Sequence, residues 1–325
     1  MTMPLLTVVI CTHNRAGLLI RTLDSLNGAR RVAEGTQLLV VANHCSDDTH
    51  QALMHYGASG TNRLPMRWLA EPIKGKSHAL NLALREVSTP LLAFVDDDQR
   101  VDACFLESIR DTARDNPEAA LICGRLLPDW DGTEPAWLHD QGPYRIYPLP
   151  IPNFDLGVQP RWLSADIAVP SGGNVVVRTS WIDRIGPFST SLGPIGHDLG
   201  GSEDSEWFLR ALQLGAKLLY APTVVQYHIV EADRLATGFL MRLTYKRTAS
   251  TVGLLGTPIV KTEVPLWAWR KLAGYSVLAL TAWGVNRRRF YLMRSAAAWG
   301  EIAGYRRLRR ERSAKVAATG AAHGS

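Results

Sequence analysis

Several widespread sequence signatures are missing from this chain of 325 residues. It has no GxGxxG motif and no GxxxxGKS/T motif, which disfavours the common dinucleotide-binding and P-loop sites. The four cysteines have no paired spacing and indicate buried thiols in a reducing compartment: Cys11, Cys45, Cys104 and Cys123. The sequence therefore offers neither a disulfide framework nor a glycine-rich phosphate loop.

A signal peptide and a membrane-spanning run are also not evident. Residues 1–10 are apolar but lack a basic start and a small-residue cleavage site, so they predict a first strand. The uncharged stretch at 272–285 has about 14 residues, fewer than the roughly 20 that a spanning helix needs. Arginines follow it at 287–289 and 306–310. This pattern predicts interfacial or re-entrant helices with snorkelling arginines, or helices that pack on the rest of the protein.

The net charge of +6 conceals two regions of opposite sign. Residues 241–325 contain sixteen Lys or Arg and three Asp or Glu, a net charge of +13, which leaves −7 for residues 1–240. An acidic body suits a metal ion and a polar substrate. A basic, Trp-rich end suits an anionic surface.

Predicted strands and helices alternate over the first hundred residues. Apolar runs predict strands and helical spacing predicts helices: strands at 5–11, 37–42, 66–70 and 91–95, and helices at 15–27, 49–56 and 77–87. This alternation predicts a parallel sheet covered by helices on both faces. Right-handed crossovers place the turns after the strands at one edge of the sheet. The polar residues at 12–15, 43–49 and 96–98 are therefore expected to converge.

Three consecutive aspartates, Asp96, Asp97 and Asp98, follow the apolar strand at 91–95. Adjacent carboxylates repel one another and are costly to bury without partners. A divalent cation would make them favourable at the carboxyl end of a strand, because Mg²⁺ and Mn²⁺ prefer carboxylate oxygen. Ligands of open α/β sheets also bind at that edge. The alternative is a solvated acidic turn.

The second half of the chain adds polar groups at the ends of predicted elements. Ser202 is suited to cap a helix whose first turn carries Glu203 and Asp204, and a strand region at 216–228 ends in His228. The acidic pair could serve only the helix dipole, and His228 could be a hydrogen-bonded structural residue.

The stretch at 128–170 has little periodicity and is rich in Pro, Trp, Tyr and Gly. A long irregular stretch of this kind is usually functional or mobile. Its residues Trp130, Trp137 and Trp162 could stack on sugar rings or simply cover the core.

Seven segments in order resemble the inverting glycosyltransferases of family 2, which have the GT-A fold. They are residues 8–15, 41–49, 75–81, 94–98, 172–174 and 201–204, and the pair Tyr227-His228 after Pro222. The resemblance covers about residues 4–230. It implies an α/β protein with a Rossmann-like, mostly parallel sheet that binds a nucleotide-diphospho-sugar, followed by a C-terminal helical appendage.

The resemblance also implies a domain organisation. We expect a catalytic domain at 1–235, with a nucleotide-binding half at 1–100 and an acceptor-binding half at 101–235. Residues 236–310 are expected to form a basic, Trp-rich, helical, membrane-associated region. The tail at 311–325, rich in small residues, is expected to be disordered.

Roles for individual residues follow from the same resemblance. Mn²⁺ or Mg²⁺ would be held by Asp98, with Asp96 nearer the ribose or a metal-bound water and His228 as a third ligand. Asp204 would be the general base that takes the proton of the acceptor hydroxyl, and Glu203 would orient the acceptor or the base. The nucleotide-binding residues would be Thr12, Asn14, Arg15, Asn43, Lys76, Asn81, Asp96 and Asp97.

The implied activity is metal-dependent sugar transfer, with inversion, from a nucleotide-diphosphate donor to a glycan or lipid-linked acceptor in cell-surface polysaccharide or glycoconjugate synthesis. A UDP-sugar is the favoured donor. GDP- and dTDP-sugars stay open because Ala42 stands where many members carry an aspartate that reads uracil. The other expected partner is an anionic membrane surface at the cytoplasmic face, with peripheral or monotopic attachment, and no nucleic acid is expected.

Two other functions remain open on the sequence. A sugar-phosphate nucleotidyltransferase would need an N-terminal glycine-rich phosphate loop, whereas the first loop, Cys11–Arg15, has no glycine. Release of pyrophosphate rather than a nucleoside diphosphate would identify it. A membrane-bound carbohydrate-binding scaffold would suit the aromatic middle and basic end, but it gives no reason for Asp96–Asp98 together with Glu203 and Asp204.

Overall fold

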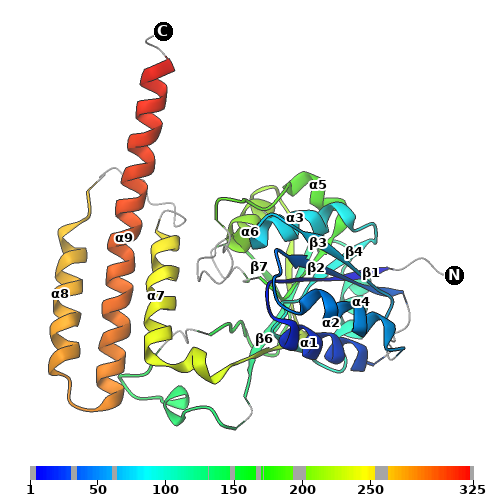
Figure 1. Ribbon diagram of the computed structural model, residues 1–325, viewed down its shortest axis with the longest axis horizontal. Coiled ribbons are helices and arrows are strands. Elements are labelled where there is room, and N and C mark those ends of the chain that lie inside the picture. The colour runs from blue at the N-terminus through cyan, green and yellow to red at the C-terminus, as the bar shows by residue number, and fades with distance from the viewer. Residues whose placement is uncertain are drawn as a thin grey trace. The chain divides into compact units, whose positions relative to one another are not determined.

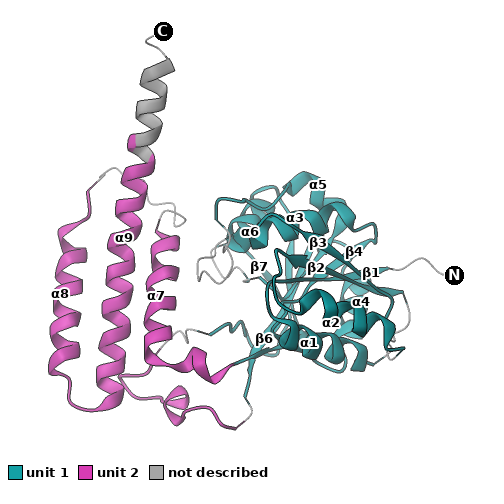
Figure 2. Ribbon diagram, viewed as in Figure 1, with its two compact units in different colours: residues 1–130, 151–198, 203–230 teal, residues 131–150, 199–202, 231–325 magenta. Residues whose placement is uncertain are grey.

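The computed structural model places the chain in two compact units (Figures 1 and 2). It describes residues 5–30, 35–60, 64–130, 132–146, 151–165, 170, 172–192, 203–252 and 263–322. Unit 1 comprises residues 1–130, 151–198 and 203–230, and unit 2 comprises residues 131–150, 199–202 and 231–325. The predicted boundary at 235 lies near the end of unit 1, whereas residues 131–150, expected in the catalytic domain, belong to unit 2.

Within the described residues, unit 1 is built on one sheet of nine strands. The strand order is β3-β2-β1-β4-β8-β6-β9-β5, with β7 also paired to β9. The strands are β1 (Leu6–Thr12), β2 (Thr36–Asn43), β3 (Met66–Glu71), β4 (Leu91–Phe94), β5 (Gln99–Val101), β6 (Leu121–Asp129), β7 (Arg161–Leu163), β8 (Val175–Arg178) and β9 (Leu218–Ile229).

The first four strands of the sheet, β1 to β4, are parallel, as the alternation of strands and helices predicted. The second half of the sheet is mixed. Strand β8 runs antiparallel to both β4 and β6, and β5 and β7 run antiparallel to β9. The parallel arrangement ends where the regular alternation of strand and helix in the sequence ends, because only a crossover connection returns a strand in the same direction.

Helices cover both faces of this sheet (Figure 1). Helices α1 (Ala16–Gly28), α2 (Thr49–Ala58) and α4 (Phe105–Asp115) bury apolar side chains on one face, and α3 (Lys76–Glu86), α5 (Ile182–Ile185) and α6 (Glu203–Gln213) do so on the other. The largest buried side chains lie in these two layers, among them Phe105 and Trp207. The predicted helix-covered α/β sheet is therefore confirmed.

Strand β9 is continuous although it contains Pro222, and it corresponds to the strand region predicted at 216–228. Its register with β6 shifts between Cys123 and Arg125. Gly124 lies so close to the Val224 carbonyl that an added Cβ would collide with it. Pro222 falls inside this irregularity, where its missing N–H costs no ladder hydrogen bond.

Unit 2 contains three long helices, α7 (Thr237–Thr251), α8 (Leu266–Thr281) and α9 (Val285–Ala322), with short turns at Ala136–His139 and Ala232–Leu235. Helix α8 begins earlier than the apolar run at 272 suggested. Helix α9 continues to Ala322 and so includes most of the tail at 311–325 that the sequence predicts to be disordered. None of the helices that the structure describes is both long and apolar enough to cross a membrane.

Candidate active site

Three turns meet at the carboxyl edge of the parallel strands β1, β2 and β4. Thr12 donates a hydrogen bond of 2.7 Å from its hydroxyl to Asp97 Oδ2. The side-chain oxygen of Asn14 accepts a hydrogen bond of 2.7 Å from the backbone N–H of Ser46. These bonds join the turns after β1, β4 and β2, so the convergence predicted from right-handed crossovers is confirmed.

Each aspartate of the triplet has a cationic partner. Arg15 contacts Asp97 Oδ1 at 2.9 Å and Asp98 Oδ2 at 3.0 Å. Lys76 Nζ, at the start of α3, contacts Asp96 Oδ1 at 3.0 Å. Asp97 and Asp98 are each only 5% exposed. The triplet is thus not a solvated acidic turn, because two of its members are buried and all three are paired.

The paired charges alter the protonation of these groups. Burial, together with the charge of the neighbouring Asp98, raises the pKa of Asp97 to about 6 against the opposing charge of Arg15. Burial alone would lower the pKa of Lys76, but the charges of Asp96, Asp204 and Glu203 hold it well above its usual value. Lys76 is therefore a fixed positive charge beside three carboxylates.

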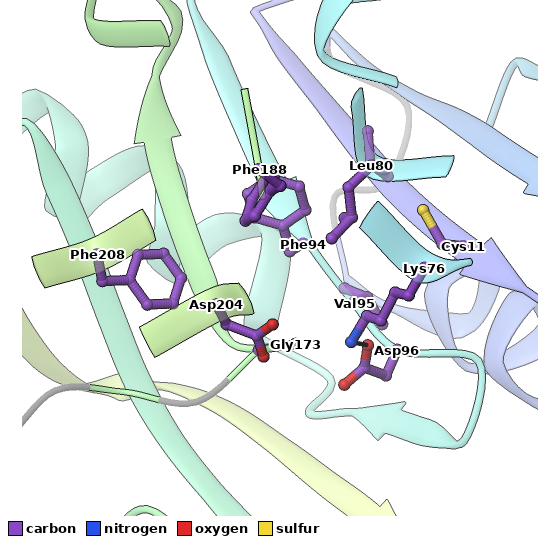
Figure 3. Close-up of a pocket in the computed structure, with 12 residues that line it drawn as sticks. Cys11, Lys76, Leu80, Phe94, Val95, Asp96, Gly173, Phe188, Asp204 and Phe208 are labelled. Atoms are coloured by element: carbon purple, nitrogen blue, oxygen red, sulfur yellow. Dashed lines mark hydrogen bonds and ion pairs between the residues drawn. The ribbon is translucent and has the colours of Figure 1, made fainter. Parts of the chain in front are cut away.

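Asp204, in the first turn of α6, and Asp96 lie on opposite sides of a glycine pair, Gly172-Gly173 (Figure 3). A Cβ at residue 172 would lie 2.5 Å from Asp204 Oδ2, and one at residue 173 would lie 2.5 Å from Asp96 Oδ2. Gly172 also has a φ of +42°, which favours glycine. The two glycines therefore leave the room in which both carboxylates sit.

A pocket opens between these carboxylates (Figure 3). Its polar wall is formed by Lys76, Asp96 and Asp204, and its lining is otherwise largely apolar: Val9, Cys11, Leu80, Phe94, Val95, Gly172, Gly173, Phe188 and Phe208. Burial raises the pKa of Cys11 to about 12, so its thiol stays protonated at neutral pH. The charged groups of this pocket are therefore carboxylates and one ammonium, and not a thiolate.

Asp98 and His228 bear on the expected metal ion. His228 Nε2 lies 3.4 Å from Asp98 Oδ2, because strand β9 pairs with β5 immediately after the triplet. The other ring nitrogen of His228 is buried and has no hydrogen-bond partner in the part of the chain that the structure describes. Asp96 faces Lys76 instead, and among the described residues no three His, Cys, Asp or Glu side chains gather around one point. These residues fit a cation whose coordination is completed by substrate phosphates, as is usual for Mg²⁺.

The structure places three predicted nucleotide-binding asparagines on backbone groups. Asn43 donates to the carbonyl of Ile73 at 2.7 Å and accepts from the N–H of Gly75 at 2.8 Å. Asn81 bonds both the N–H and the carbonyl of Phe188, at 2.7 and 3.0 Å. With Asn14 bonded to Ser46, all three hold the loops that form the site.

Gln99, a buried residue that the sequence reasoning did not single out, directly follows the acidic triplet. Its side-chain oxygen accepts the N–H of Asp96 at 3.0 Å, and its side-chain nitrogen, which has no partner among the described residues, points toward Gly173. Its position directly after the triplet is the feature of the sequence that could have identified Gln99 as a site residue. The predicted cap Ser202 and its neighbour Gly201 lie outside the described residues. Glu203 is described and is 2% exposed.

Comparison with known proteins assigns the class. Residues 7–186 match the family described as glycosyl transferase family 2, so the chain belongs to this family of glycosyltransferases. The succinoglycan biosynthesis protein ExoM of Rhizobium meliloti (strain 1021) is 25% identical over 248 residues, which cover 76% of this chain and 73% of ExoM. The validoxylamine A glucosyltransferase of Streptomyces hygroscopicus subsp. jinggangensis (strain 5008) is 32% identical over 108 residues, 33% of this chain and 25% of that protein.

Solved structures show the same fold. The mannosyltransferase PcManGT from Pyrobaculum calidifontis, in complex with GDP-Man and Mn²⁺, aligns with a TM-score of 0.52 and 17% identity over 99% of this chain and 80% of that chain. S. aureus TarS 1–349 in complex with UDP-GlcNAc aligns with a TM-score of 0.51 and 13% identity over 93% of this chain and 91% of that one. The chain therefore has the GT-A fold and a helical C-terminal region.

Proposed function

We propose that this family 2 glycosyltransferase transfers a sugar, with inversion and with the help of Mn²⁺ or Mg²⁺, from a nucleotide-diphosphate donor to a hydroxyl of a glycan or lipid-linked acceptor. The observation that carries the proposal is the position of Asp204. Its carboxylate lines the same pocket as the Lys76–Asp96 ion pair, and its Oδ1 is buried with no hydrogen-bond partner among the described residues. An unpartnered buried carboxylate oxygen is costly unless a ligand supplies a donor.

In this proposal Asp204 is the general base. The acceptor hydroxyl donates its hydrogen bond to Asp204, and its oxygen forms a bond to the anomeric carbon as the bond from that carbon to the diphosphate oxygen breaks. The proton passes to Asp204, and the nucleoside diphosphate leaves with the electron pair. One displacement on the face opposite the leaving group inverts the anomeric configuration. Glu203, buried beside Asp204 at the start of α6, orients the base or the acceptor.

The departing diphosphate needs its charge neutralised. Asp98 and His228 are the residues that would hold the metal ion, and when bound this ion supplies Lewis-acid stabilisation of the leaving group. Lys76, which pairs with Asp96, adds a permanent positive charge. Its ammonium would contact a phosphate or the ribose of the donor. Thr12 and Arg15 each donate a hydrogen bond to Asp97, and these three residues would shape the nucleotide side of this edge.

The comparisons bear on the nucleotide of the sugar donor and on the acceptor. The structural neighbours were solved with GDP-Man and with UDP-GlcNAc. Ala42, in place of an aspartate, leaves uridine without its usual partner. GDP-sugars and UDP-sugars are therefore both candidate donors. The name of ExoM supports an acceptor in polysaccharide synthesis. We further propose that the enzyme works at the cytoplasmic face of the cell membrane, where the basic region at 241–325 would meet anionic lipid. Membership of the family does not favour the nucleotidyltransferase alternative.

The decisive experiment combines a donor panel with a base variant. Purified protein and Mn²⁺ are incubated with UDP-, GDP- and dTDP-sugars, and release of nucleoside diphosphate is measured. With the active donor, Asp204→Asn should bind nucleotide-sugar like the wild type but turn over about 10²–10⁴ times more slowly, because the amide cannot accept the proton.

Glu206→Gln is the matched control, because Glu206 lies in the same first turn but is paired with Arg210. It should keep most of the activity. Normal turnover by Asp204→Asn would transfer the role of base to Glu203. Release of pyrophosphate instead of a nucleoside diphosphate would overturn the proposed function.

A further inference from the structure

Unit 2 exposes large apolar side chains where its helices α8 and α9 meet. Leu280, Trp283 and Val285, which we call the α8–α9 corner, are 83%, 95% and 72% exposed. We propose that this corner inserts into the surface of a bilayer that contains anionic lipid, so that unit 2 is a monotopic anchor. This inference rests on the membrane location proposed above and deepens it, because it names the residues that enter the lipid; it does not depend on the active site.

The packing inside unit 2 supports a lipid environment. Within the described residues, α8 buries only Ala268 and Ala279. Helix α9 contacts α7 through Gly300, where an added Cβ would lie 2.3 Å from the Tyr245 carbonyl, and through Gly304. Small residues between helices and large apolar residues outside are typical of helices packed in lipid, whereas helices of water-soluble proteins bury their large apolar residues.

The exposed apolar surface continues from the corner along α8. Leu266, Val277 and Leu280 are exposed at helical spacing on this helix, at 78%, 58% and 83%. Monomeric proteins in water rarely expose contiguous apolar surface of this extent. Because none of the described helices is suited to cross a bilayer, a helix of this kind is expected to lie in the interface plane.

The charges beside the corner select anionic lipid as its partner. Arg287 and Arg288 follow the corner directly and are exposed. Cations also lie over aromatic rings near the start of α8: Lys271 Nζ is 4.9 Å from the ring centroid of Trp267, and the Arg306 guanidinium is 5.2 Å from that of Trp269. Tryptophan and arginine in this combination suit the boundary between lipid headgroups and acyl chains.

A second copy of the chain fits this surface less well. Two copies joined by their corners would bring Arg287 and Arg288 of each copy to the same interface, together with the other cations of a region whose net charge is +13. Like charges at a contact oppose association. An anionic leaflet offers the opposite charge and an apolar interior together.

Flotation of the full-length protein tests the proposal. The probe is vesicles of phosphatidylcholine with about 30% phosphatidylglycerol, at low and at about 0.15 M salt. The wild type should float with them. The double variant Leu280→Glu/Trp283→Glu should reduce the bound fraction at least about tenfold, because two charges would enter the apolar layer. The matched control is Trp162→Glu/Leu214→Glu, which changes two side chains of unit 1 that are 44% and 43% exposed and should float like the wild type.

A second measurement reports insertion itself. Trp283→Phe should still float, but it should lose part of the fluorescence quenching that brominated acyl chains cause in the wild type. Donor binding by the double variant should be unchanged, so failure of this proposal is separate from failure of the proposed function. The proposal is overturned if the wild type stays at the bottom of the gradient at both salt concentrations or if the double variant floats like the wild type. It is also overturned if the wild type is a dimer that the double variant splits without a change in flotation.

Discussion

The two units differ in how many of their large apolar side chains they bury. Unit 1 encloses its largest apolar residues, such as Trp207, Phe105 and Phe208, between a sheet and two layers of helices, and its carboxylates gather at one edge. Unit 2 buries fewer large side chains, among them Leu240, Met293 and Ile302, and leaves Trp283, Leu280 and other large apolar residues exposed. The charges divide in the same way, −7 for residues 1–240 and +13 for residues 241–325.

This difference shows that each unit suits its own surroundings. A core of large apolar residues is stabilised by removal of those residues from water, so unit 1 is suited to water on all its outer faces. Helices that meet through small residues gain close backbone packing but bury little apolar area, so unit 2 has little of that stabilisation in water. If the comparison is correct, equivalent substitutions in the two units will have very different effects.

The largest effect is expected from removal of the Asp98 carboxylate in unit 1. Asp98→Ala should abolish sugar transfer and the metal dependence of nucleotide binding, because it removes the carboxylate that lies beside His228. The fold should survive, since loss of one of three crowded carboxylates relieves repulsion in the metal-free protein. Transfer assays with Mn²⁺, nucleotide titrations with and without EDTA, and a thermal melt measure the three quantities.

The control for Asp98→Ala is Asp115→Ala, at the end of α4, where the carboxylate pairs only with exposed Arg114 among the described contacts. It should leave transfer unchanged. Full activity of the wild type in EDTA would show that the leaving group does not depend on a metal ion.

A pair of tryptophan truncations tests the burial contrast. Trp207 is fully buried, stacks on Phe188 with ring centroids 4.9 Å apart, and donates its indole N–H to the Gly186 carbonyl at 2.8 Å. Trp207→Ala should lower the free energy of unfolding of unit 1 by about 3–5 kcal/mol. Trp283→Ala should change that of unit 2 by no more than about 0.5 kcal/mol, because its side chain contacts mainly solvent. Hydrogen exchange in increasing urea, read on the amides of each unit, gives both values, and similar losses would contradict the contrast.

Two glycine-to-alanine changes in unit 2 sharpen the comparison further. Gly300→Ala should destabilise the α7–α9 contact by about 1–3 kcal/mol, since its methyl group would meet the Tyr245 backbone. Gly274→Ala, in α8, meets nothing within 4 Å and should stabilise the helix by up to about 1 kcal/mol. Exchange protection of α7 and α8 separates the two. If Gly300→Ala and Gly274→Ala changed exchange protection equally, small residues would not be what holds α7 to α9.

Much of unit 1 could be predicted from its sequence because the information is local. Apolar runs predict β1 to β4 to within about two residues, and the crossover rule predicts that Thr12, Asn14 and Asp97 lie at one edge. The second half of the sheet was harder. Strand β9 is kept whole across Pro222 by a register shift opposite Gly124, and no periodicity within either strand signals that long-range match.

The residues of the site could be predicted from the sequence, but the ion pairs between them could not. The sequence places three aspartates and two basic residues at one edge, but it does not say that Arg15 takes Asp97 and Asp98 while Lys76 takes Asp96. That division depends on where α1 and α3 begin relative to the triplet, which is a matter of packing. The backbone roles of Asn43 and Asn81 were hidden for the same reason, because a side chain's hydrogen-bond partner is fixed only when the neighbouring loop is placed.

Glycine at position 173 is a point at which the active site tolerates no substitution. Gly60 needs its glycine for the backbone, with a φ of +68° and nothing within 4 Å, so residues such as Asn that adopt this conformation are the natural replacements. At Gly173 the constraint is crowding by Asp96 and Gln99, which every side chain violates whatever its conformational preference. A methyl group, the smallest change that the genetic code offers there, therefore meets the same obstacle as the largest side chain.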